Sequence, residues 1–413
     1  MSGTTYTAAT TAKLNREDLS DIISVVDARS TIVTSMIKKG KKPESALSEW
    51  IVDSYGSAKT SGVVDGTDAS GSTTNFEDFS SNRKRAQNYL QTFRRTPLVT
   101  RLQEIVAQPA GISNPDPNGA SGSTEFGRAK SKAVIQLKRD IESAILSDNG
   151  AQADDGSAQP FITRALGSWL STTADSVLGQ DTSILLNTNQ VYAAALTSFN
   201  EDKLRTALQQ RWNTSGEMKE LVGIMSPGLK NAVSDFTRYL PTKSNFGQVR
   251  YFDQSVPDKT ITTAVDVYEG DYGTVKLFLS PWLPAQVTGL SYTISTNTVT
   301  VTSTAHGLQK GALIQVSGDS NTSQITTGFY RILSAATDTF TFTRSGTGTT
   351  AGTLTYGDNR GYILDMDYLE LRTALAPSYL PLPDLGAGPR GIVEAIVSLA
   401  YLNPTSGIKI AAY

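Results

Sequence analysis

The sequence predicts an α+β fold with an all-β module inserted late in the chain. Helical and extended patterns follow one another over most of the 413 residues. The block Pro284–Gly357 differs from both of its flanks, because it holds 19 threonines and only five charged residues. It separates a strand-rich stretch, Val265–Pro284, from its continuation at Asn359–Ala374. A scaffold that accepts a whole β module between two strands displays that connection at a free surface.

Composition narrows the classes of function. The net charge of −2 gives no general electrostatic footprint for nucleic acid or acidic membranes. Cysteine is absent and His306 is the single histidine. This inventory excludes Cys- and His-rich zinc sites, thiol nucleophiles and a Ser-His-Asp triad outside the inserted block. With no apolar run near the roughly 20 residues of a membrane span, and no signal-peptide core, we expect a soluble protein made in the cytoplasm.

A flexible arm followed by a long extended loop is predicted for the first hundred residues. Apolar residues from Asp18 to Lys39 have a partly helical spacing. The stretch Gly56–Ser81 is poor in apolar residues and lies between two predicted strands, Ser48–Ser54 and Tyr89–Leu98. Its return limb is basic, with Arg83, Lys84, Arg85, Arg94 and Arg95. Long loops without a core of their own are usually functional or disordered.

The clearest helix is predicted over Phe126–Asp148. Its apolar residues recur at three- and four-residue steps: Ala133, Val134, Leu137, Ile141, Ala144 and Ile145. Ser123 or Thr124 can cap its start, and Asn149-Gly150 ends it. At about 1.5 Å per residue the rod spans roughly 33 Å.

An α/β subdomain is predicted after an irregular stretch over 151–180. Asn200 caps a helix from Glu201 to Trp212, and a buried strand, Leu221–Met225, leads into a second helix. Further strands are expected at Gln248–Phe252, Val265–Tyr268 and Thr274–Ser280. In the inserted block they are expected at Ser291–Ser303, Leu313–Ser317, Gly328–Ser334 and Thr339–Arg344. The host sheet resumes with Tyr362–Arg372, Ile392–Leu402 and Ile408–Ala411.

Taken in order, these pieces resemble the major capsid proteins of tailed bacteriophages, which have the HK97-like fold. The segment 129–148, AKSKAVIQLKRDIESAILSD, is similar to the spine helix of a capsid family common in podoviruses. LVGIMSPGLKNAVSDF (221–236) is similar to a strand and helix of its axial domain, and DYGTVKLFLSPWLP with RGYILDMDYLELRTAL to its late strands. The inserted text resembles small β modules of phage structural proteins.

The resemblance implies a division of the chain and a function without an active site. The divisions are an N-terminal arm (1–46), an extended loop (47–100), a peripheral domain (101–182, spine helix 126–148), an axial domain with late peripheral strands (183–283 and 358–413) and the inserted β domain (284–357). Subunits are expected to assemble as hexamers and pentamers into an icosahedral shell around double-stranded DNA, in the virion. No catalytic residue, cofactor or metal is expected.

The same resemblance implies partners. Only about 45 residues precede the extended loop, so scaffolding is expected from a separate protein. A portal protein is a further expected partner, and packaged DNA lies nearby without sequence-specific binding. For the inserted β domain three alternatives stay open: a decoration protein, a host glycan or no partner. The extended loop is expected over the spine helix of a neighbouring subunit. Candidate inter-subunit contacts are Arg83, Arg85, Arg94, Arg95, Asp140 and Glu142, with a solvated charged face as the alternative.

Several local patterns have a chemical interpretation and a structural one. Gly386–Gly391 fits G-x-G-x-x-G but lacks the βαβ context, so it is predicted to be a loop. Asp365, Asp367 and Glu370 form either a salt-bridging strand face or an acid–base site. Asp148, Asp154 and Asp155 give a weak calcium signal. His306 is expected to bond turn backbone, and the Lys38–Lys42 cluster to lie on the surface, with packaged DNA or scaffold as alternative contacts.

Two rival functions come from other classes. One is a phage tail or adhesin component whose β module binds a receptor. The other is a glycan hydrolase that uses Asp365, Asp367 or Glu370, for which the sequence offers no additional supporting motif.

Overall fold

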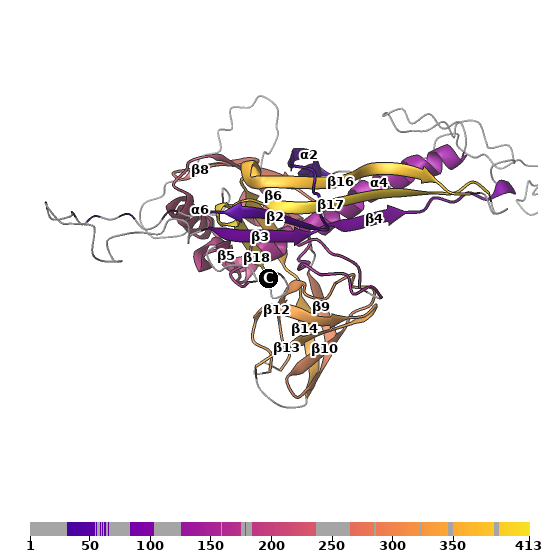
Figure 1. Ribbon diagram of the computed structural model, residues 1–413. Helices are drawn as coiled ribbons and strands as arrows, with labels where there is room; N and C mark the ends of the chain where they lie inside the picture. The colour runs from indigo at the N-terminus through magenta and orange to yellow at the C-terminus, as the bar shows by residue number, and fades with distance from the viewer. Residues whose placement is uncertain are drawn as a thin grey trace, which may run out of the picture. The chain divides into compact units, whose positions relative to one another are not determined.

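The computed structural model (Figure 1) describes residues 31–53, 83–102, 125–157, 159–174, 184–236, 265–284, 286–321, 324–345, 350–383 and 388–413, with single positions between 54 and 66 and at 178. Contacts divide the chain into two compact units. Of the described residues, the first unit holds 94–102, 125–136, 379–383 and 388–393, and the second holds the remainder. The strand Gln248–Phe252 and most of the loop 56–81 lie outside the described residues.

The first unit contains the first half of helix α4 (Glu125–Leu146) and the chain segments beside it. Leu98 bridges Arg390 in antiparallel fashion. The rings of Phe126 and Tyr379 meet edge to face with 6.2 Å between centroids. The ammonium of Lys130 lies over both rings, 5.5 and 4.9 Å from their centroids. These contacts hold the first turns of α4 by packing and cation–π attraction.

The second unit is organised around a six-stranded sheet of order β5-β18-β15-β6-β8-β7. Its strands are Val191–Tyr192 (β5), Ile408–Ala412 (β18), Asn359–Leu364 (β15), Glu220–Met225 (β6), Gly273–Leu279 (β8) and Val267–Gly270 (β7). Helices α6 (Glu201–Ser215) and α7 (Pro227–Asp235) share its apolar core, which includes Leu208, Leu229 and Ile410. This sheet and its helices confirm the predicted α/β alternation.

Local sequence explains both helices. The Asn200 side chain accepts the Lys203 N–H at 3.1 Å and caps α6. Gly216, with φ of 67°, ends this helix in the left-handed conformation that glycine adopts without strain. Pro227 occupies the first turn of α7, where no backbone N–H is needed.

The extended loop begins and returns through an antiparallel hairpin. Its strands are β2 (Leu47–Val52) and β3 (Lys84–Tyr89), with Trp50 opposite Ala86. The predicted return strand Tyr89–Leu98 was therefore placed too late, because Lys84–Tyr89 buries only Ala86 and Asn88 and has no apolar alternation to mark it. Part of the predicted strand is β4 (Gln91–Arg95), which belongs to another sheet of order β1-β16-β17-β4.

That four-stranded sheet joins distant parts of the chain. Its strands besides β4 are β1 (Lys38–Lys39), β16 (Leu369–Pro381) and β17 (Gly391–Tyr401). Lys38 pairs with Glu370 in a parallel register. β1 follows the short helix α2 (Ile32–Met36), so the described end of the predicted helical stretch Asp18–Lys39 is a helix only to Met36 and a strand at Lys38–Lys39.

The inserted block forms a closed barrel of order β10-β13-β12-β11-β14-β9, whose strands gather in orange in Figure 1. Its strands are Val287–Ser295 (β9), Thr298–Thr302 (β10), Leu313–Ser317 (β11), Gly328–Ala335 (β12), Thr339–Thr343 (β13) and Thr350–Tyr356 (β14). The predicted strand Ser291–Ser303 is two strands, because the chain turns at Thr296, where φ is 59°. Strand β14 was not predicted, because its threonine-rich sequence resembles that of the loops around it.

The end of the host sheet also differs from the prediction. Tyr362–Arg372 is split between β15 and β16, which lie in different sheets. The 3-10 turn η5 (Met366–Tyr368) separates them, and the Asp365 side chain caps it by accepting the Asp367 N–H at 3.0 Å. Strands β17 and β18 agree with Ile392–Leu402 and Ile408–Ala411.

Short elements complete the second unit. They are α5 (Leu166–Trp169), η3 (Thr188–Gln190), η4 (Leu196–Ser198) and η6 (Pro404–Ser406). Of these, α5 is wholly buried and carries Trp169. The stretch predicted to be irregular therefore contains a buried turn on which the hairpin rests, since the rings of Trp50 and Trp169 lie 5.5 Å apart.

Candidate functional site: the buried charge cluster and the hairpin

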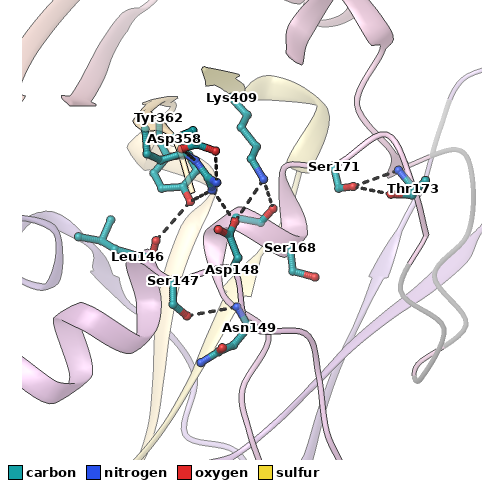
Figure 2. A network of polar contacts seen from close by, with 12 residues as sticks. Leu146, Ser147, Asp148, Asn149, Ser168, Ser171, Thr173, Asp358, Tyr362 and Lys409 are labelled. Carbon is teal, nitrogen blue, oxygen red and sulfur yellow. Dashed lines mark hydrogen bonds and ion pairs between the residues drawn. The ribbon is translucent and has the colours of Figure 1, made fainter. Parts of the chain in front are cut away.

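A cluster of buried charges lies where α4 ends and the barrel begins (Figure 2). Asp148 follows α4, Asp358 directly precedes β15, Arg360 is the second residue of β15, and Lys409 is the second residue of β18. Arg360 donates to both oxygens of Asp358, from Nε and Nη2, at 2.6 Å each. Its third nitrogen, Nη1, pairs with Asp148 and donates to the Tyr362 hydroxyl at 2.9 Å. The bidentate contact of Nε and Nη2 with the two Asp358 oxygens is the geometry in which arginine binds carboxylates most strongly.

Lys409 completes the cluster. Its ammonium lies 3.3 Å from the Asp148 carboxylate and donates to the Gly167 carbonyl at 2.8 Å. The Tyr362 hydroxyl donates in turn to the Leu146 carbonyl at 3.2 Å, close to the end of α4. Two carboxylates and two cations therefore balance one another inside the protein.

Burial and pairing act in opposite directions on these groups. Burial alone would raise the pKa of Asp148, but the charges of Arg360 and Lys409 outweigh it and lower that pKa. Burial raises the pKa of Asp358 in spite of Arg360. Burial, with repulsion from Arg360, lowers the pKa of Lys409 to about 8. Such a cluster is costly to desolvate and is stable only while every member keeps its partner.

The barrel is attached beside this cluster. The Leu313 N–H of β11 donates to the Asp148 carbonyl at 3.0 Å. The Lys409 ammonium lies 4.7 Å from the centre of the Phe329 ring of β12. Arg331, also on β12, donates to the Ala174 carbonyl at 3.1 Å. The barrel is thus held to the second unit through backbone and charged contacts.

A cavity of about 500 Å³ lies at the same junction. It is lined from the α4 side by Asp140 and from the barrel by His306 and Gln315. Pro284 and Gly357, the two ends of the inserted block, both line it. The chain therefore enters and leaves the barrel at one place. His306 accepts the Leu308 N–H on Nδ1 at 3.0 Å, which confirms the prediction that it bonds turn backbone.

The hairpin is anchored by a residue that the sequence interpretation did not single out. Asn88 is fully buried, and its amide nitrogen donates to the Thr163 hydroxyl and to the carbonyls of Arg164 and Leu399. Its amide oxygen accepts the Arg164 N–H at 2.7 Å. Both ends of this amide thus fix the base of the hairpin, while Ile51 on β2 remains 71% exposed.

Four of the six residues predicted to contact a neighbouring subunit are arginines. Arg83 pairs with Asp53 at 3.5 Å and Arg85 with Glu49 at 3.7 Å, in each case across exposed surface of the same hairpin. Arg94 and Arg95 are exposed residues of β4. Exposed pairs of this kind contribute little to stability, roughly 0–1 kcal/mol.

The prediction for the two acids of α4 needs one correction. Asp140 is partly exposed. Glu142 is 0% exposed, and its carboxylate oxygens accept the N–H groups of Val33 and Thr34 at 2.8 Å each. These amides belong to the first turn of α2, so Glu142 caps that helix within its own chain. Its carboxylate is therefore not available to the arginine of a neighbouring subunit.

The three carboxylates considered for acid–base chemistry all lie in salt bridges. Asp365 is buried beside Arg211, with 3.4 Å between Oδ2 and Nη2. Asp367 is exposed and pairs with Lys38 at 2.6 Å, which places this lysine of the basic cluster in an ion pair. Glu370 lies 3.6 Å from Arg372. Lys219 also bridges Asp365 and Asp367, at 3.5 and 3.7 Å, so all three acids are engaged in salt bridges.

The calcium interpretation of the aspartates is also replaced by other contacts. Asp148 belongs to the charge cluster. Asp154 accepts the Gly156 N–H at 2.7 Å, and Asp155 accepts those of Ser157 and Gln159 at 2.9 Å each, as in Asx turns. Among the described residues no group of three His, Cys, Asp or Glu is placed to hold a metal ion. Of the predicted loop Gly386–Gly391, Gly388 precedes strand β17, Gly391 begins it, and neither opens a helix; Gly386 lies outside the described residues.

The described architecture, with hairpin, long helix, terminal strands and inserted barrel, is that of a tailed-phage capsid subunit. The capsid of cyanophage A-1(L) is similar to this chain with a TM-score of 0.51 and 13% identity, over 98% of this chain and 99% of that chain. The capsid of a native GTA particle is similar with a TM-score of 0.50 and 9% identity, over 98% and 97%. At these identities the likeness shows the HK97-like fold.

The family follows from the sequence. The model of the SU10 major capsid protein family matches residues 2–329, and this chain belongs to that family. It is a major capsid protein, a structural subunit of a virion shell that associates with copies of itself. A search of curated proteins found no significant match. In the described residues, no helix is both long and apolar enough to cross a membrane.

Proposed function

We propose that this capsid protein closes its shell as hexamers and pentamers through the β2–β3 hairpin, which lies over a neighbouring subunit. The observation that carries this proposal is the contrast between the two ends of the hairpin. Its base is fixed by Asn88 and by Trp50 against Trp169, whereas Ile51 exposes a large apolar side chain from a regular strand. A rigidly based strand pair with an uncovered apolar residue is suited to cover a partner surface.

The basic residues of this region are proposed to add specificity. Arg83 and Arg85 each pair with an exposed acid of the same hairpin, at 3.5 and 3.7 Å. A carboxylate of a neighbouring subunit can approach either guanidinium more closely and form a shorter charged hydrogen bond. Three further residues remain candidate contacts because their side chains reach the surface: Arg94 and Arg95 are exposed, and Asp140 is partly exposed. Charges at the rim of an interface govern association rate and register more than affinity.

The barrel is proposed to be a separable domain, 284–357, displayed at the shell surface. Support comes from its closed sheet and from the approach of its two ends, Pro284 and Gly357, to one cavity. An insertion whose ends meet can be removed without stretching the host. The other divisions proposed are the arm (1–46), the extended loop (47–100), the peripheral domain (101–182) and the axial domain (183–283 with 358–413).

The partners proposed for the assembled particle are a separate scaffolding protein, a portal protein and a decoration protein. Packaged double-stranded DNA would lie inside without sequence-specific contacts, in keeping with a net charge of −2. Assembly is proposed in the cytoplasm of the bacterial host, with no enzymatic activity.

Electron microscopy of the protein co-expressed with its neighbouring phage genes tests the proposal. Closed icosahedral particles are expected for the wild type and for a variant in which a short linker replaces residues 285–357. Ile51→Asp should leave folded, unassembled subunits, because a buried unpaired charge opposes association. Leu333→Asp, at an exposed position of the barrel, is the matched control and should assemble. Normal particles from Ile51→Asp would contradict the role of the hairpin, and tubes or rings from the wild type would contradict the shell.

A further inference from the structure

The barrel holds a buried arginine that is only partly used. Arg344 follows β13, and its side chain is 9% exposed. Its backbone N–H donates to the Asn297 carbonyl at 2.9 Å, and Nη1 donates to the carbonyl and side-chain oxygens of Gln324 at 3.0 and 3.1 Å. The guanidinium is therefore fixed in position from one side.

The other side of the same guanidinium has no hydrogen-bond partner among the described residues. Nε and Nη2 are both buried, and neither makes a hydrogen bond to any described residue. These two nitrogens form the edge with which arginine binds both oxygens of a carboxylate at once. Leaving two buried donors of a cation without acceptors costs free energy, so a ligand that accepts hydrogen bonds from both recovers that cost as binding free energy.

A cavity of about 290 Å³ opens at this arginine. Besides Arg344, it is lined by polar side chains and one ring: Gln324, Thr326, Tyr330, Thr343 and Ser345. This volume lies at the lower end of the range of small-molecule pockets, about 300–1,000 Å³. It suits a single small polar ligand better than a chain segment of another protein.

No carboxylate of the described part of the barrel neutralises Arg344. Asp319 is already occupied, because it accepts the Tyr292 hydroxyl at 2.6 Å and the N–H groups of Asn321 and Ile325 at 3.0 Å. A positive charge, two aligned donors and surrounding hydroxyl groups thus meet in one small cavity.

We propose that this cavity binds the carboxylate of an acidic sugar, with Arg344 Nε and Nη2 donating to its two oxygens. The hydroxyls of Thr326, Thr343 and Ser345 and the Gln324 amide supply donors and acceptors for the hydroxyl groups of the sugar, and the Tyr330 ring gives one apolar wall. A hexuronate carries both kinds of group on a molecule of suitable size. The site goes beyond shell assembly, since it would let the barrel bind acidic polysaccharide.

Saturation-transfer-difference NMR on the full-length protein, free or assembled, tests the site. The probes are glucuronate, glucose and inorganic sulfate, and a short glucuronate oligomer distinguishes a polysaccharide source from a free acid. Arg344→Gln removes the charge and the paired donors, whereas Arg344→Lys keeps the charge alone. Arg331→Gln is the matched control, because that guanidinium belongs to the same barrel and already donates to the carbonyls of Gly311 and Ala174.

Glucuronate should give ring-proton signals and glucose none. Binding should weaken at least about tenfold in Arg344→Gln and less in Arg344→Lys, and it should be unchanged in Arg331→Gln. Tighter binding of the oligomer would assign the source to polysaccharide, and equal binding would assign it to the free acid. Equal signals from glucose and glucuronate, sulfate binding without any sugar signal, or full binding by a folded Arg344→Gln protein would overturn the proposal. All these outcomes are independent of whether shells form.

Discussion

The carboxylate of Asp148 and the ammonium of Lys409 lie 3.3 Å apart in the interior, although 261 residues separate them in the sequence. Asp148 directly follows the long helix α4, and Lys409 lies in the terminal strand β18. Because Arg360 also pairs with Asp148, one carboxylate links the end of α4, the strand β15 that follows the barrel, and the last strand. The position of the barrel therefore depends on charges as well as on apolar packing.

Asp148→Asn should strongly destabilise the protein. The amide would leave Arg360 and Lys409 buried with one negative charge, that of Asp358, between them, and breaking a buried pair in this way costs about 3–5 kcal/mol. Chemical denaturation of the unassembled subunit measures the loss. Asp154→Asn is the matched control, since an asparagine can keep the exposed turn contact to the Gly156 N–H. Equal stabilities of the two variants would show that the cluster contributes little.

The pH dependence of Lys409 has a definite sign. In the folded protein its pKa is about 8, below its ordinary value of 10.5. Between these two values the unfolded chain binds more protons, so the contribution of this residue to the free energy of unfolding rises with pH. Below about pH 8 both states are protonated and the full cost of burying the ammonium is present.

Comparison of wild type with Lys409→Met isolates this effect. From pH 8 to 10.5 the wild type should gain stability relative to the variant, in which no group titrates at this position. Thermal unfolding of both proteins over that range measures the difference. A stability difference that stays constant, or falls, across the window would mean that Lys409 keeps an ordinary pKa when buried.

The sequence predicted secondary structure best where buried apolar residues recur at a regular spacing. Leu137, Ile141 and Ile145 have helical spacing and are buried along α4, and Leu221–Met225 is an unbroken apolar strand. It was least informative where polar residues form strands. Lys84–Tyr89 pairs with β2 by backbone hydrogen bonds and carries few apolar side chains, so it resembles a loop. Threonine-rich β14 was missed for the same reason.

The charge cluster illustrates a second limit. Lys409 stands between Ile408 and Ile410 in a buried strand, and this unusual placement is the one signal that could have marked it. Its partner Asp148 was instead considered as a calcium ligand, because a single sequence does not show which distant charges meet. Glu142 was misassigned for the related reason that its partners are backbone N–H groups, which no residue type reveals.

Glu142→Gln should release the first turn of α2 from α4. The carboxylate accepts two N–H groups at 2.8 Å, and a glutamine can offer one carbonyl oxygen while its amide nitrogen opposes the second N–H. Hydrogen exchange at Val33 and Thr34 should accelerate, in line with a loss of about 1–3 kcal/mol. Glu125→Gln, at an Arg128-paired position of the same helix, should leave those amides protected. Unchanged exchange in Glu142→Gln would show that α2 is held by other contacts.

Gly167→Ala tests how tightly the cluster is packed. A Cβ atom at this position would lie 1.9 Å from Oδ1 of Asp148 and 2.7 Å from the Tyr362 hydroxyl, so a methyl group must displace the carboxylate from its cations. The expected destabilisation is about 3–5 kcal/mol, comparable to that of Asp148→Asn, because both changes disrupt the same pairing.

The double variant of Gly167→Ala and Asp148→Asn sharpens this test. It should be destabilised by much less than the sum of the two single changes, as is usual for residues that act through one network. Gly328→Ala is the control, since nothing lies within 4 Å of the added Cβ there. Additive losses in the double variant would mean that Gly167 acts on backbone packing alone, and that its contact with Asp148 is incidental.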